Sequence, residues 1–396
     1  MAGIYIHIPF CRKACHYCNF HFSTLLKGKN DFTQALLKEI ELQNNYLQNE
    51  AIQTIYFGGG TPSLLEKNEL FEIMKQLIQH YNIHEKAEIT LEANPDDIDK
   101  EKLQEWKEAG VNRLSIGIQS FFEEDLKWMN RAHNAEQARN CISLAQQTGF
   151  DNLSVDLIYG TPTLTDEKWR ENIGIAVTMN IAHLSCYALT VEPGTALQKM
   201  ITQRKKEDID TEKQARHFLL LIDWLEQSGY EHYEISNFAK PGYRSRHNSS
   251  YWSGEKYLGF GPSAHSFSGQ YRQWNISDNA LYIQSLLQNT IPFEKELLTT
   301  TQHLNEYIMT SLRTREGLNL SYVEEKFGKP ISLQLKMNSK KFIENQNLSL
   351  NNMQLQLTKE GKLFADGIAA DLFFTGSCDD ANIVQPELSS GKAPLK

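Results

Sequence analysis

The first 230 residues alternate short apolar strands with amphipathic helices, and this alternation restricts the possible folds more than any other feature of the chain. Strand–helix–strand units connect with a right-handed crossover and build parallel sheets. Six such units predict an α/β fold, a partial (βα)6 barrel of the TIM type. The expected strands are 4–10, 54–57, 88–92, 112–119, 151–158 and 183–189, with helices at 31–48, 66–80, 99–109, 136–147, 167–179 and 211–228.

Polar or glycine residues stand at the carboxyl end of five of these strands. A cysteine-rich loop follows the first strand and three glycines, 58–60, follow the second, while Glu92, Gln119 and Asp156 lie on the third, fourth and fifth. A single such residue is explained by a structural hydrogen bond or a helix cap. Their common position favours a binding site, because that end of the sheet is the active face of α/β barrels.

Cys11, Cys15 and Cys18 have the spacing C-x3-C-x2-C directly after the first strand. Thiolates are soft ligands that select zinc, Cu(I) or iron–sulfur clusters. Structural zinc sites and four-iron cubanes both take four protein ligands when closed. The remaining cysteines (Cys141, Cys186 and Cys378) are far away in sequence, so a cubane here would keep one iron open. A zinc site completed by His16 or His21 is the alternative.

This motif, followed by Gly-Gly-Gly-Thr-Pro at 58–62, resembles the radical S-adenosylmethionine (SAM) superfamily, in which SAM chelates the open iron of a [4Fe–4S] cluster. The resemblance covers most of the chain. It is to the branch with the oxygen-independent coproporphyrinogen III dehydrogenases (HemN) and the HemW-type haem chaperones. The resemblance implies metal ligation by the three cysteines and SAM contacts for Tyr5, Tyr17, Gly59, Gly60, Thr61, Glu92, Gln119, Arg131 and Asp156. Ala188 on the sixth expected strand would supply backbone contacts to the adenine of SAM.

Two features argue against the dehydrogenases, and a third favours the chaperones. Phe20 stands where the dehydrogenase motif has a further cysteine, and the chain starts at the first strand, without that enzyme's N-terminal extension. Residues 247–252 read H-N-x-x-Y-W, which resembles the haem-binding signature of the HemW type. A neutral imidazole is a standard axial ligand of haem iron, so the resemblance implies that His247 binds haem, with Arg244 and Arg246 near the propionates. His265 is a further candidate ligand, although a structural role is favoured for it.

The resemblance therefore implies a haem chaperone that holds a [4Fe–4S] cluster, SAM and haem and passes haem to an acceptor protein, with an electron donor for the cluster. The alternative is a true coproporphyrinogen III dehydrogenase, which decarboxylates propionates oxidatively. No catalytic residue is assigned, and whether the chain is an enzyme stays open at this point.

The remaining expectations concern partners, location and domains. The net charge of −9 disfavours a nucleic-acid partner. No signal peptide and no transmembrane segment is visible, so we expect a cytoplasmic protein. The expected division is a barrel at 1–230, a linking segment with the haem motif at 231–300, a mostly helical, winged-helix-like domain at 301–374, and a disordered tail at 375–396.

Overall fold

The computed structural model describes residues 2–376. They form two compact units, of which the first ends at Leu297 and the second begins at Leu298. The tail expected at 375–396 lies outside the described residues from position 377 onward, as does Cys378. Within residues 2–376, no helix is both long and apolar enough to cross a bilayer.

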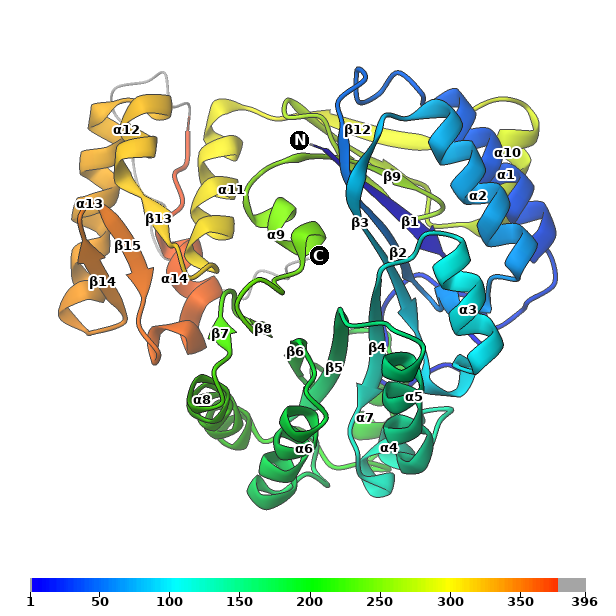
Figure 1. The fold of residues 1–396 in the computed structure, drawn as a ribbon. Helices are drawn as coiled ribbons and strands as arrows, with labels where there is room; N and C mark the ends of the chain where they lie inside the picture. Colours follow the sequence, from blue (N-terminus) through cyan, green and yellow to red (C-terminus); the bar gives the residue numbers. More distant parts are fainter. Residues whose placement is uncertain (1, 377–396) are drawn as a thin grey trace. The chain divides into compact units, whose positions relative to one another are not determined.

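Six neighbouring parallel strands form the centre of the first unit, and helices cover the outer face of the sheet (Figure 1). The strands are β1 (Ala2–Ile8), β2 (Ile52–Gly59), β3 (Ile83–Ala93), β4 (Arg113–Gln119), β5 (Leu153–Tyr159) and β6 (His183–Ala188). The intervening helices are α1 (Lys29–Leu42), α2 (Lys67–His80), α3 (Lys100–Glu108), α4 (Glu123–Met129), α5 (Ala135–Gln147) and α6 (Asp166–Thr178), with α7 (Ala196–Thr202) and α8 (Thr211–Gln227) after β6. The predicted α/β fold is confirmed; α4 and α7 were not predicted.

Several of these helices begin where the sequence supplies a side-chain cap. Asp99, Thr165 and Asp210 each accept a hydrogen bond from the backbone three residues on, at the starts of α3, α6 and α8. Such caps satisfy amide groups that have no partner within the helix.

Residues 231–297, expected to link the barrel to the C-terminal domain, contribute six strands to the same sheet. The whole order is β12-β11-β10-β9-β1-β2-β3-β4-β5-β6-β8-β7, which leaves two edges and an incomplete barrel. Strand β9 pairs parallel to β1, whereas β10 to β12 continue antiparallel. The added elements are β7 (Glu231–His232), β8 (Asn237–Ala239), α9 (Arg246–Trp252), β9 (Lys256–Phe260), β10 (His265–Phe267), β11 (Tyr271–Asn275), α10 (Asn279–Leu287) and β12 (Phe293–Leu297).

The interior of the barrel is polar along much of its depth. Ser115 and Asp156 are hydrogen-bonded across β4 and β5, and Ser154 bonds His183 across β5 and β6. Helix α9 lies on the inner side of the curved sheet, next to β2 (Figure 1). Buried polar groups are costly unless they are hydrogen-bonded, so this interior indicates a site rather than a purely structural core.

The second unit follows the expected order of three helices and a hairpin. It consists of α11 (Thr300–Leu312), β13 (Leu318–Asn319), α12 (Leu320–Phe327), α13 (Lys329–Glu344), β14 (Leu348–Asn351), β15 (Gln354–Leu357) and α14 (Ala365–Asp371). The strands form a three-stranded sheet, β13-β15-β14. This is the winged-helix-like arrangement that the sequence predicts, with β13 and α14 added.

Candidate cofactor-binding site

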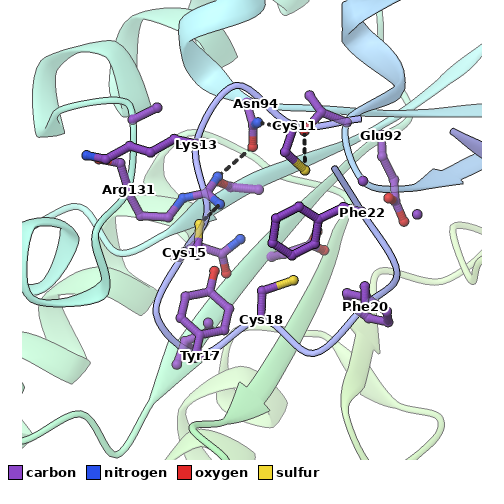
Figure 2. A pocket seen from close by; sticks show the side chains of 18 of the residues that line it. Cys11, Lys13, Cys15, Tyr17, Cys18, Phe20, Phe22, Glu92, Asn94 and Arg131 are labelled. Atoms are coloured by element: carbon purple, nitrogen blue, oxygen red, sulfur yellow. Dashed lines mark hydrogen bonds between the residues drawn. The ribbon is translucent and has the colours of Figure 1, made fainter. Parts of the chain in front are cut away.

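A cavity of about 390 Å³ opens at the carboxyl ends of the parallel strands. All three cysteines of the N-terminal motif line it, and their side chains lie on one loop around it (Figure 2). Two backbone contacts attach the loop: the amide of Cys11 donates to the carbonyl of Ser23, and the amide of His16 to that of Met129. Phe20 lies at the edge of the cavity with 67% of its surface exposed, so no fourth thiol faces the other three from that position.

Two of the cysteine sulfurs accept hydrogen bonds. Nη1 of Arg131 donates to Cys15 Sγ at 3.2 Å, and the hydroxyl of Thr61 donates to Cys11 Sγ at 3.3 Å. Burial raises the pKa of Cys11 to about 11 and also raises the pKa of Cys18. Both shifts favour the neutral thiol at Cys11 and Cys18, whereas a bound cation would favour the thiolates.

Arg131 is held by more than its contact with Cys15. Its Nη2 donates to Asn94 Oδ1 at 2.6 Å and to the carbonyl of Gly117 at 2.8 Å, while its Nε is buried without a partner among the described residues. Asn94 in turn donates to the hydroxyl of Thr61 at 3.3 Å. The loop, β3 and the segment after α4 are thus joined through a single guanidinium.

The glycine run after β2 permits a close approach of the backbone to the cysteine loop. Gly59 has φ +104°, and a Cβ there would lie 2.5 Å from the ring of His7. A Cβ on Gly60 would lie 2.7 Å from the carbonyl oxygen of Phe10. A side chain at Gly59 would therefore clash with β1, and one at Gly60 would clash with the backbone directly before Cys11.

Gln119 adopts a conformation that residues other than glycine rarely take. Its φ is +65°, and the pairing of β4 with β5 shifts in register between Ile116 and Gln119, as at a β-bulge. Bulges redirect side chains, and strained residues concentrate at functional sites. The bulge leaves Gln119 lining the cavity at the end of β4.

Two carboxyl groups face the cavity from neighbouring parts of the barrel. Burial raises the pKa of Glu92 to about 7 and that of Asp156 to about 6, and their mutual proximity adds to the shift of Glu92. The hydroxyl of Tyr56 donates to Glu92 Oε1 at 2.7 Å. Near neutral pH this pair can accept hydrogen bonds from a polar ligand or take up a proton.

Most of the residues expected to contact SAM line this one cavity: Tyr17, Gly59, Gly60, Thr61, Glu92, Gln119, Arg131, Asp156 and Ala188. Tyr5 does not line it; its ring stacks on Tyr56 below the cavity, and its hydroxyl lies 3.2 Å from His7 Nδ1. The cavity also includes residues that the sequence reasoning missed, among them Asn94, Asp96 and Ser115. The positions of Asn94 and Asp96 directly after β3 were the available signal, whereas Ser115 lies in the first half of β4.

His247, the expected haem ligand, lies on a helix rather than in a loop. It is in the first turn of α9, its side chain is 1% exposed, and it does not line the cavity. Nδ1 lies 2.8 Å from the hydroxyl of Thr54, and Nε2 lies 2.8 Å from the hydroxyl of Tyr251. Burial lowers the pKa of His247 to about 3, so the ring is neutral. Both nitrogens are engaged, and no porphyrin can reach them in this arrangement.

The neighbouring candidates are also engaged. Arg244 pairs with Glu231, while Arg246 donates to the carbonyl of Lys86 and to Gln53. His133, two residues after Arg131, is bonded through Nε2 to the carbonyl of Ile118. His265, by contrast, is exposed on β10.

The cavity fits a charged, polar ligand next to a group bound by thiols. The Nε of Arg131 and Oδ1 of Asp96 are buried without partners among residues 2–376, and each needs a partner that the chain does not supply. In the same part of the chain, no three His, Cys, Asp or Glu side chains are grouped closely enough to hold a single metal ion.

Comparison with known proteins gives consistent matches. The model of the radical SAM superfamily matches residues 5–174, and that of the HemN C-terminal domain matches residues 298–364. The chain is similar to "Heme chaperone HemW" of Bacillus subtilis, with 32% identity over 93% of this chain and 98% of the relative. The protein of the same name from Escherichia coli is 37% identical over 66% of this chain and 69% of the relative.

Among solved structures, the coproporphyrinogen III oxidase HemN of Escherichia coli matches with a TM-score of 0.82 and 24% identity, covering 94% of this chain and 90% of that one. This likeness supports the fold: the barrel and the C-terminal unit occur together in both proteins. Because the HemW relative from Bacillus subtilis is 32% identical and is matched over 98% of its length, the chain belongs to the HemW-type haem chaperones of the radical SAM superfamily.

Proposed function

We propose that this chain is a haem chaperone that holds a [4Fe–4S] cluster on Cys11, Cys15 and Cys18, binds SAM next to it, and takes up haem for transfer to an acceptor protein. The observation that carries the cofactor part is the convergence of three thiols, Arg131 and two buried carboxyl groups on one cavity. The names of the relatives carry the haem part.

In the proposed site, the cysteine loop provides the thiolates. Arg131 and Thr61 donate hydrogen bonds to two of the sulfurs and so stabilise their negative charge. A reduced cluster with SAM on its open iron would supply a one-electron reductant for the sulfonium. Phe20 at the cavity edge leaves that iron without a protein ligand from this loop.

The remaining residues would orient SAM. Glu92 and Asp156 can accept from ribose hydroxyls, and Gln119 can both donate and accept. Gly59 and Gly60 line the cavity, and their backbone can come close to a ligand because neither residue carries a side chain. Arg131 would meet the methionine carboxylate through its free Nε, since both of its Nη atoms already bond to the protein.

Haem is the cargo in this proposal, but the buried side chain of His247 is out of its reach in this structure. Ligation by His247 requires α9 to leave the barrel interior, which breaks the contacts of the ring with Thr54 and Tyr251. We propose that haem binding and transfer involve this opening. The free thiols suit a reducing compartment, and we propose the cytoplasm.

The cluster is tested by anaerobic reconstitution with iron and sulfide. Serine variants of Cys11, Cys15 or Cys18 should lose the absorbance and the electron paramagnetic resonance signal of the reduced cluster. Cys141→Ala is the matched control, because that thiol is buried on α5 away from the cavity. SAM should change the resonance signal of the wild-type protein. Zinc without sulfide in the anaerobically isolated protein would contradict the proposal.

The chaperone function is tested on the same sample. Haemin titration should give a Soret shift, and the loaded protein should pass haem to an apo-haemoprotein. Anaerobic incubation with coproporphyrinogen III, SAM and a reductant should leave the substrate unchanged. Conversion to protoporphyrinogen IX would instead favour the dehydrogenase.

A further inference from the structure

The inner side of the sheet continues beyond α9 as a partly exposed aromatic surface. It carries Tyr257 on β9, Phe267 and His265 on β10, and Trp274 and Arg272 on β11, and we call it the inner aromatic face. Among the residues that alternate with them, Leu258, Ser266, Gln273 and Asn275 point the other way and are buried. Among these, Asn275 donates to Glu39 of α1 at 2.6 Å. The sheet is thus covered on one side, while its aromatic side is accessible.

The register of the sheet connects this face to the haem motif. Thr54 pairs with Gly3, Gly3 with Tyr257, and Tyr257 with Phe267, so these positions form one transverse row. A Cβ on Gly3 would lie 3.5 Å from the ring of His247, which places His247 over the same row.

Ring contacts follow the same path. The centroid distances are 5.0 Å from His247 to Tyr251, 4.6 Å from Tyr251 to Tyr257, and 6.3 Å from Tyr257 to Phe267. The inner aromatic face is therefore continuous with the surroundings of His247.

His265 and His247 differ in accessibility. The imidazole of His265 is exposed and stacks on Trp274, the residue directly opposite it, with a centroid distance of 6.2 Å and an interplanar angle of 29°. No hydrogen bond to its ring is found within residues 2–376. Partial burial and the charge of Arg272 lower the pKa of His265, so the ring is neutral at physiological pH and its lone pair is available.

We propose that the inner aromatic face is the first docking surface for haem, with His265 as the axial ligand of the iron while His247 is still enclosed. Flat apolar rings match the faces of a porphyrin. The guanidinium of Arg272 adds positive charge on the same side, whereas Glu294 and Glu296 on the neighbouring strand β12 disfavour propionates at that edge. The propionates therefore point away from β12. This inference rests on the proposed haem chaperone function and adds a site to it.

The test uses the full chain and stopped-flow mixing with haemin. Loss of a residue that only hydrogen-bonds to a metal ligand typically lowers metal affinity by about ten- to a hundredfold. His265 is proposed as a direct ligand of the iron, so its loss should cost at least as much. His265→Ala should therefore weaken or slow initial haemin capture by at least about tenfold. His247→Ala should still capture haemin in a first step and should lose the step that follows, because His247 is enclosed during initial capture. His84→Ala is the matched control, because His84 is an exposed histidine at the start of β3, outside the inner aromatic face.

Two further measurements separate ligation from a structural role. His265→Met should restore capture but change the ligand-field spectrum of the first complex, because sulfur replaces nitrogen on the iron. Iron-free protoporphyrin IX should bind to wild-type and His265→Ala protein alike.

The inference is overturned if His265→Ala captures haemin at the wild-type rate and affinity, or if His265→Met gives the wild-type spectrum. Loss of all binding in His247→Ala alone would also overturn it, while leaving the proposed function intact. A wild-type protein that binds no haemin would refute the proposed function itself.

Discussion

Thr54→Val tests whether haem reaches His247 by the opening of α9. The hydroxyl of Thr54 is the partner of His247 Nδ1 at 2.8 Å, and Thr54 itself lies on β2, outside the haem motif. Valine keeps the shape of the side chain and removes the hydrogen bond. The closed position of α9 then holds a buried ring nitrogen without a partner, whereas the open position is solvated and unaffected.

The magnitude follows from the cost of an unsatisfied buried group, about 1–3 kcal/mol. Because about 1.4 kcal/mol corresponds to a factor of ten in an equilibrium constant, opening becomes about 5- to 150-fold more favourable. The apparent affinity of a ligand that binds only the open state rises by the same factor while that state is rare. Thr54→Val should therefore bind haem more tightly although it is less stable.

The assay is an equilibrium haemin titration, combined with hydrogen exchange of the α9 amides. Thr33→Val is the matched control: Thr33 is buried on α1 and its hydroxyl bonds the carbonyl of Lys29, away from α9. Faster exchange in α9 together with an unchanged haem affinity would refute the reasoning, because it would show that opening occurs and that haem does not use it.

Three further predictions concern the cavity. Arg131→Lys should lower SAM affinity by at least about tenfold, measured by calorimetry on the reconstituted protein, because an ammonium cannot replace the fork that joins Cys15, Asn94 and Gly117. Gly59→Ala should lower the free energy of unfolding by about 1–3 kcal/mol, measured as a lower thermal unfolding temperature, since φ is +104° and the methyl group meets His7. Gly174→Ala in α6 is the control: a Cβ there meets nothing within 4 Å, so this substitution should raise the unfolding temperature. SAM binding should weaken between about pH 8 and about pH 5.5, because Glu92 with a pKa of about 7 and Asp156 with a pKa of about 6 take up protons there and lose acceptor capacity. For the empty protein the same raised pKa values act in the opposite direction: Glu92 favours the folded state below its unfolded pKa of about 4.5, and this contribution is lost as the pH rises to about 7. A SAM affinity that is flat across this range would contradict the assigned role of the two carboxyl groups.

The repeating strands and helices could be predicted because their information is local. Apolar periodicity indicates the parallel strands. Parallel strands run in the same direction, so their carboxyl ends lie together at one edge of the sheet. The ends of β1 to β5 therefore had to meet, and Glu92, Gln119 and Asp156 with them. Asn94 and Asp96 were missed because they flank Pro95 and read as an ordinary turn.

The region from 231 to 297 could not be predicted in the same way. Its strands are two to five residues long, and their pairing with β1 and β6 is fixed by contacts far away in sequence. Helix α9 has only seven residues, and the cap by Ser245 and the burial of His247 stabilise it. A helix this short has little intrinsic stability. The sequence showed the haem motif but gave no sign that the fold encloses its histidine.

The polar interior connects the cavity to the haem motif through one residue. The hydroxyl of Tyr56 donates to Glu92 at the cavity, and its ring stacks on His247 with a centroid distance of 4.9 Å. A ligand that hydrogen-bonds to the Glu92 carboxylate competes with the Tyr56 hydroxyl for the same oxygen. Without that hydrogen bond, the Tyr56 ring is held less firmly in its stacked position against His247. A barrel built only for stability would fill these positions with aliphatic side chains, because buried carboxyl, hydroxyl and imidazole groups cost free energy. Their presence between two candidate sites is the physical reason to treat cofactor binding and haem access as properties of one interior.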